Sequence, residues 1–127
     1  MTQEDKDLLL KVLCDGLPYG LVVEYKGKPY EILGYGCGRL SLVKKYESRI
    51  AACPLIEEVK PYLRPMSSMT DEEKEQTRDL WIGADTKTHA IRLIDFYNKN
   101  HFDFMGLIPK DLAIPVTEEN NPYEPTN

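Results

Sequence analysis

The chain has few of the residues that metal sites and disulfide frameworks need. It contains three cysteines and two histidines in 127 residues, and no cysteine pair has the C-x-x-C spacing. An odd cysteine count without that spacing argues against a zinc ribbon and against a set of disulfides. Reduced thiols suit a reducing compartment. We therefore expect a cytoplasmic protein that folds without a metal or other cofactor.

Long apolar runs and a basic charge balance are also missing. Residues 1–6 are polar, without the basic stretch ahead of an apolar run that is typical of a secretory signal. No run approaches the roughly 20 apolar residues that cross a bilayer, so we expect no membrane contact. The net charge is −5. Since contacts to phosphates supply much of the affinity of nucleic-acid binders, this balance disfavours that function.

The composition that is present favours one globular domain. Hydrophobic residues make up 42% of the chain and charged residues 29%, which are values typical of folded domains. The last eleven residues, 117–127, contain three glutamates and two prolines but no large apolar side chain except Tyr123. Such a segment cannot bury enough apolar surface to fold by itself. We expect a single domain over residues 1–116 and a disordered acidic tail over residues 117–127.

The first half of the chain predicts a helix followed by antiparallel strands. Thr2 precedes an amphipathic stretch as a cap, and Gly16 is expected to end it as a left-handed residue. Strands are predicted around 19–25, 29–33 and 39–45, with a possible fourth over 50–55. A two-residue turn at 26–27 pairs Val23 with Tyr30. The strands form an antiparallel meander.

The second half predicts a connection and two helices. Two prolines break any helix within residues 56–68, so we expect an extended connection on the domain surface. Thr70 and Glu73 form a capping box for a largely polar helix that runs to about residue 81. A second helix runs from about residue 85 to residue 99, and its apolar side is broad enough to predict burial against the sheet. The expected class is α+β, with both of these helices packed on the sheet.

Residues 34–39 form a glycine-rich loop that is a candidate ligand site. Amides near Gly36 and Gly38 can converge on an anion, with Cys37 between them and Arg39 as a charged fork. A phosphate loop normally leads from a strand into a helix, whereas this one joins two strands. A glycine-rich turn is therefore the alternative interpretation. Cys37 would need a histidine as base, and His101 beside Asp103 is one candidate.

Residues 60–69 form a candidate partner-binding segment. It contains Tyr62, Arg64, Met66 and Met69 among two prolines. Tyr, Arg and Met are enriched at the centres of protein interfaces, and proline lowers the entropy lost on docking. The alternative is that Tyr62 and Met66 simply cover the core.

Three stretches of the sequence resemble segments found in a known group of proteins. They are residues 6–20, residues 60–70 with the sequence KPYLRPMSSMT, and residues 102–110 with the sequence FDFMGLIPK. Through these three stretches, the chain resembles a group of small uncharacterised proteins carried by phages, prophages and mobile elements of gut bacteria. No activity is established for that group. The resemblance implies a bacterial cytoplasm and an accessory gene of a phage or prophage.

Three functions remain open from the sequence. The first is a non-catalytic module that binds a host or phage protein. The second is a small-molecule or nucleotide binder, or a weak hydrolase, that uses the loop from Gly34 to Arg39. The third is single-stranded nucleic-acid binding on the sheet face, through stacking on Tyr30 or Tyr35. The sequence does not indicate an oligomeric state.

Overall fold

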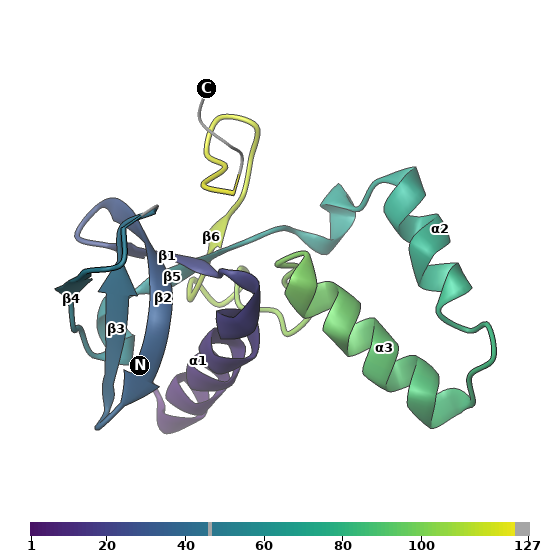
Figure 1. Cartoon of the computed structure of the whole chain (residues 1–127), viewed down its shortest axis with the longest axis horizontal. Coiled ribbons are helices and arrows are strands. Elements are labelled where there is room, and N and C mark those ends of the chain that lie inside the picture. The colour runs from purple at the N-terminus through teal and green to yellow at the C-terminus, as the bar shows by residue number, and fades with distance from the viewer. Residues whose placement is uncertain (46, 124–127) are drawn as a thin grey trace.

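The computed structural model describes residues 1–45 and 47–123 and confirms the α+β class (Figure 1). The helices are α1 (Gln3–Gly16), α2 (Asp71–Asp79) and α3 (Thr86–Lys99). The strands are β1 (Val22–Tyr25), β2 (Lys28–Gly36), β3 (Arg39–Val43), β4 (Ile50–Ala52), β5 (Lys60–Leu63) and β6 (Ile114–Pro115). No helix in the described residues is long and apolar enough to cross a membrane.

The strands form one six-stranded sheet in the order β4-β3-β2-β1-β5-β6. Neighbouring strands are antiparallel except for β5 and β6, which are parallel. Helix α1 covers one face, because Leu9 and Leu13 are fully buried in the same cluster as Val23 and Leu42. This cluster is the core of the domain.

Helix α1 begins as predicted but ends differently. The Thr2 hydroxyl accepts a hydrogen bond from the Asp5 amide at 3.1 Å, which confirms the cap. Gly16 has a right-handed backbone with φ −84°, so it is not the left-handed residue that we expected. The glycine is needed for space instead, because a Cβ atom there would lie 2.8 Å from Cδ2 of Leu21. The left-handed residue is Gly20, with φ 71°.

The first hairpin has the predicted register. Val23 lies opposite Tyr30, and the Ile32 amide donates to the carbonyl of Leu21 at 3.2 Å. Lys26 and Gly27 have φ values of 52° and 78°. A tight two-residue turn of this hand requires positive φ at both positions. The expected third and fourth strands are present as β3 and β4.

The segment 56–68 is not a surface connection. It contains β5, which lies between β1 and β6, and Pro61 and Leu63 on this strand are buried. Proline excludes a helix, but its φ near −65° and the extended backbone that it favours in the preceding residue are compatible with a short strand. The prediction that prolines exclude any helix here holds for an α-helix only, because two short 3-10 helices, η2 (Ile56–Glu58) and η3 (Met66–Ser68), flank the strand that was missed.

Helices α2 and α3 do not pack on the sheet, contrary to the prediction. Neither helix contains a buried residue, and Figure 1 shows both extending away from the sheet. The segment that follows α3 occupies the place expected for them. Its residues Leu107, Leu112 and Ala113 belong to the core cluster. With α1 and this segment in the core, the two helices form a projecting arm.

The C-terminal segment also differs from the expected tail. Residues 124–127 lie outside the described residues, but residues 117–123 include a residue that contacts the sheet. The hydroxyl of Tyr123 donates to the carbonyl of Tyr62 at 2.6 Å and accepts from the amide of Val22 at 3.1 Å. These bonds bridge β1 and β5. The packed part of the chain therefore extends beyond residue 116.

Candidate functional site

Four exposed apolar side chains lie on the arm, which we define as α2, the turn over residues 80–85, and α3. Trp81 is 50% exposed, Ile82 72%, Ile91 61% and Ile94 46%. Exposed apolar side chains that gather in one region mark interaction sites, whereas scattered ones are ordinary. The arm is therefore the first candidate site.

The arm keeps its shape through polar contacts at its helix ends. The Thr70 hydroxyl accepts from the Glu73 amide, and the Glu73 carboxylate accepts from the Thr70 amide, as the capping box predicts. The Asp85 carboxylate caps α3 by accepting from the Thr88 amide at 2.7 Å, which holds the pKa of Asp85 below its ordinary value. In the turn, Arg92 donates to the carbonyls of residues 80 and 82. The helices thus form without a core of their own.

One ion pair joins α2 to the body of the protein. The Arg64 guanidinium donates to both carboxylate oxygens of Glu73, each at 2.7 Å. The same guanidinium lies 4.2 Å from the ring centroid of Phe102. The hydrogen bonds from Arg64 lower the pKa of Glu73 to about 2. Two parallel bonds of this kind fix orientation as well as distance, so Arg64 clamps the arm to β5.

Helix α3 has its own attachments to the body. The hydroxyl of Tyr19 donates to the carboxylate of Asp95, and this bond raises the pKa of Tyr19. The ring of Tyr97 packs against Phe104 with centroids 5.2 Å apart, and the ring of Phe96 packs against Phe102 at 6.2 Å. These contacts lie at the C-terminal end of α3. The N-terminal end, with the turn, projects into solvent (Figure 1).

The inner side of the arm contains an aromatic stack. The rings of Trp81 and His89 lie parallel, with centroids 3.5 Å apart and 9° between their planes. A cavity of about 180 Å³ lies beside this stack, and Leu93 and Tyr97 of α3 contribute to its wall. The side of α3 that bears these residues faces α2.

The four residues of the predicted partner segment do not form one surface. Tyr62 is buried, with 6% of its surface exposed, and Arg64 is bound to Glu73. Met66 is exposed, and Met69 is half-buried. Burial therefore favours the alternative for Tyr62, whose backbone carbonyl also accepts from the Tyr123 hydroxyl. Met66 is the exposed apolar member of the set.

The glycine loop forms a hairpin turn between β2 and β3. Gly36 ends β2 and Arg39 begins β3. Cys37 and Gly38 between them have φ values of 53° and 76°. The guanidinium of Arg39 donates to the carbonyl of Cys53 at 2.9 Å, so it holds the neighbouring segment. These observations favour the glycine-rich turn, which was the alternative interpretation.

The pair of His101 and Asp103 does not form a catalytic dyad. The Asp103 carboxylate accepts from the amides of Leu107 and Ile108 at 2.7 and 2.9 Å, which fixes the following loop. The His101 ring stacks on Tyr123, with centroids 4.0 Å apart. Burial lowers the pKa of His101 to about 4, and its Nδ1 atom is buried without a hydrogen-bond partner. The imidazole thus stays neutral at physiological pH.

The thiol of Cys37 is exposed, and within the described residues it is not paired with a histidine. No hydrogen bond joins Cys37 to either imidazole in the described chain, because His89 stacks on Trp81 and His101 stacks on Tyr123. In residues 1–45 and 47–123, no three His, Cys, Asp or Glu side chains lie close enough together to hold a metal ion.

The two tyrosines proposed for stacking on nucleic-acid bases differ in exposure. Tyr30 is half-buried against the core, whereas Tyr35 is exposed.

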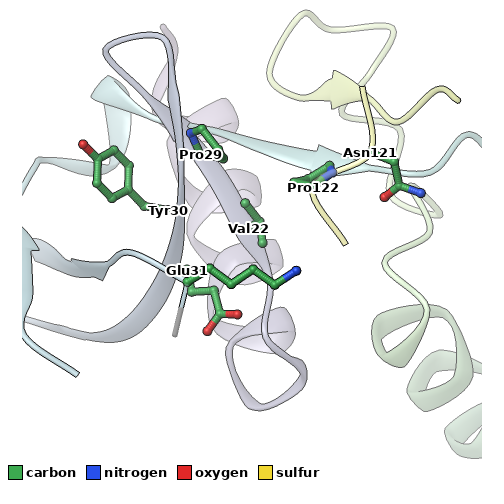
Figure 2. Close-up of a pocket in the computed structure, with 7 residues that line it drawn as sticks. Val22, Pro29, Tyr30, Glu31, Asn121 and Pro122 are labelled. Carbon is green, nitrogen blue, oxygen red and sulfur yellow. The ribbon is translucent and has the colours of Figure 1, made fainter. Parts of the chain in front are cut away.

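A second candidate site lies on the sheet face opposite α1 (Figure 2). Val22 faces this side, since its neighbours Leu21 and Val23 belong to the core. The pocket has a volume of about 170 Å³. Its lining residues are Val22, Pro29, Tyr30, Glu31, Lys45, Asn121 and Pro122. Figure 2 shows the Tyr30 ring pointing away from the space, so this residue contributes chiefly its backbone.

Sequence reasoning missed both candidate sites for identifiable reasons. The broad apolar side of α3 was assigned to the core, although the almost wholly polar α2 gives α3 little to pack against. The pocket depends on Asn121 and Pro122, which were assigned to a disordered tail. The one signal for that pocket was Tyr123, the single large aromatic residue in an otherwise polar segment.

Comparison with known proteins gives no further guide. No family model matches the chain, and no curated protein and no solved structure matches it either. The function of this chain must therefore be argued from its own residues.

Proposed function

We propose that the protein is a non-catalytic protein-binding module and that the arm is its binding surface. The observation that carries this proposal is the absence of any buried residue in α2 and α3, although α3 is apolar on more than one side. An isolated helix of about 12–15 residues is marginal in water, and most helical stability comes from tertiary packing. A partner that covers α3 would supply this packing.

The energy available at this surface supports the proposal. Full burial of an isoleucine side chain contributes about 1.5–3 kcal/mol, and an indole ring contributes a comparable amount or more. Trp81, Ile82, Ile91 and Ile94 each retain roughly half or more of this apolar surface in solvent. Interface centres are enriched in aromatic residues, and truncation of one such anchor typically costs about 2 kcal/mol or more.

The side chains that the sequence offered as ligand-binding or catalytic groups support a non-catalytic role. Arg39 and Arg64 already bind carbonyl or carboxylate groups of the chain itself. The Asp103 carboxylate binds two backbone amides, and the half-buried His101 ring stacks on Tyr123. A catalytic nucleophile needs a base within hydrogen-bond reach, and Cys37 has no such bond to an imidazole in the described residues. The setting that the resemblance implies, a bacterial cytoplasm and an accessory gene of a phage or prophage, remains part of the proposal.

Photo-cross-linking in a bacterial cytoplasm tests this function. A photoreactive amino acid at position 82 in the arm is compared with one at position 33 on β2, because Ile82 and Leu33 are both exposed apolar residues. We expect a discrete protein adduct from position 82 and none from position 33. Equal labelling at both positions, or no adduct at position 82, would contradict the proposal.

The pocket in Figure 2 supports a second candidate function, the binding of a small and largely apolar molecule. Val22, Pro29 and Pro122 supply apolar contact, and Glu31 and Lys45 supply two groups of opposite charge. A thermal-shift screen tests this function, since a ligand at a hundred times its dissociation constant adds about 2.7 kcal/mol. Failure of every small molecule, nucleotides included, to raise the melting temperature would count against both this pocket and the glycine loop.

A further inference from the structure

We propose that the partner of the arm is a second copy of this chain and that the two α3 helices pack antiparallel across Ile91 and Ile94. This inference rests on the proposed function, since it assumes that the arm is a protein-binding surface. It names the occupant of that surface and the register in which it binds.

A single stripe on α3 has the spacing that helix pairs use. Lys87, Ile91, Ile94 and Asn98 follow one another at intervals of four, three and four residues, so they lie on one side of the helix. Both isoleucines are exposed, whereas His89, Leu93 and Tyr97 on the other side of α3 line the cavity next to α2. Helix α2 therefore leaves the stripe uncovered.

Charge complementarity favours a second copy in the antiparallel orientation. A two-fold axis midway between residues 92 and 93 places Ile91 across from Ile94 of the other copy. It also places Lys87 across from Asn98 and one helical turn from Asp95 of the other copy, within reach of its long side chain. A parallel pair would instead place Lys87 beside Lys87. The stripe is thus complementary to itself in the antiparallel orientation.

The charged side chains beside the stripe permit contact between the two α3 helices. Asp95 is held in place by the hydrogen bond that one of its carboxylate oxygens accepts from Tyr19. Arg92 donates to the carbonyls of residues 80 and 82, so its charge is directed to the turn rather than to the stripe. A two-fold contact buries the same patch twice and closes the assembly at a dimer.

Sedimentation equilibrium of the full chain tests the inference. We expect a monomer–dimer equilibrium that Ile94→Lys shifts strongly toward monomer. Loss of one interface anchor typically weakens binding about thirtyfold, and the two-fold symmetry removes it twice, so the expected effect is about a thousandfold. The matched control is Ile50→Lys on β4, because Ile50 is 51% exposed and lies outside the arm. Far-ultraviolet circular dichroism checks that both variants keep their helices.

A charge exchange tests the register independently. Lys87→Glu alone and Asp95→Lys alone are each expected to weaken the dimer about tenfold at low salt, because each places like charges together at two symmetric positions. The double variant is expected to recover most of this loss. If the double variant is as weak as the sum of the single variants, the antiparallel register is wrong.

The results separate this inference from the proposed function. A chain that stays monomeric at high concentration, or a dimer that Ile94→Lys leaves intact, overturns the inference. If the cross-link from position 82 then joins the arm to a different protein, the proposed function stands and only the self-association is wrong. If position 82 gives no adduct and the chain is monomeric, both are wrong.

Discussion

Replacement of Glu73 by glutamine tests the clamp that holds the arm to the body. Glutamine keeps an oxygen that can accept from the Thr70 amide, so the capping box survives. The substitution removes the carboxylate that binds both arms of the Arg64 guanidinium. It therefore isolates the ion pair from the helix cap.

The structure sets the expected magnitude. The pKa of Glu73 is lowered from 4.5 to about 2, chiefly by the hydrogen bonds from Arg64 and to a smaller extent by the Thr70 cap, which the substitution retains. Since one pKa unit corresponds to about 1.36 kcal/mol, the full difference amounts to about 3 kcal/mol. The side chains of Arg64 and Glu73 remain 24% and 14% exposed, so solvent screens part of the attraction. We expect Glu73→Gln to lower the free energy of unfolding by about 2 kcal/mol at pH 7.

The pH dependence provides a second check on the same group. The pKa of Glu73 is lower in the folded chain than in the unfolded chain, so its carboxylate stabilises the fold above about pH 4.5. This contribution declines as the pH falls from 4.5 to about 2, where the folded carboxylate takes up its proton. The difference between wild type and Glu73→Gln should therefore shrink over this range.

Urea denaturation and hydrogen exchange of the α2 amides measure the effect globally and locally. Glu72→Gln is the control, because Glu72 lies on the same turn of α2 and is exposed. The reasoning is refuted if Glu73→Gln changes neither the unfolding free energy nor the α2 protection more than Glu72→Gln does. It is also refuted if the difference persists unchanged at pH 2.

Three further substitutions test the contacts that shape the body, each by urea denaturation at pH 7. Tyr123→Phe removes the hydroxyl that bonds to the Tyr62 carbonyl and should cost about 1–2 kcal/mol; no loss would mean that the C-terminal segment is not anchored. Gly16→Ala places a methyl group 2.8 Å from Leu21 and should cost about 1–3 kcal/mol, so a stabilised variant would contradict the close approach. Asp103→Asn can still accept one amide bond but not two charge-assisted ones, and should cost about 1–3 kcal/mol. An unchanged midpoint for Asp103→Asn would show that these bonds are replaced by water.

The sequence predicted the features that depend on neighbouring residues. The Thr2 cap and the register that pairs Val23 with Tyr30 follow from hydrogen bonds and turn geometry within a few positions. The box formed by Thr70 and Glu73 is equally local. In each case the residue types near the feature determine the geometry, and no distant segment competes for it.

The sequence could not predict features that depend on competition between distant segments. Strand β5 exists because β1 and β6, more than 35 residues away on either side, supply its hydrogen-bond partners. The arm projects because residues 107–113 fill the core place that α3 was expected to take. The prediction that α3 is buried against the sheet was wrong, because an apolar pattern does not reveal which of several apolar segments reaches the core. For the same reason, the candidate site was placed at 60–69 rather than on the arm.

Pro115 at the end of β6 limits the hydrogen bonds that this edge of the sheet can offer to another chain. Its nitrogen has no hydrogen to donate, so the two-residue outer strand of the sheet offers few backbone groups to an incoming chain. At the opposite border, β4 is only three residues long. Growth of the sheet into a cross-β stack is therefore disfavoured at both borders. The proposed pairing of two copies through α3 fits this arrangement, because it depends on side chains and not on the backbone of a sheet edge.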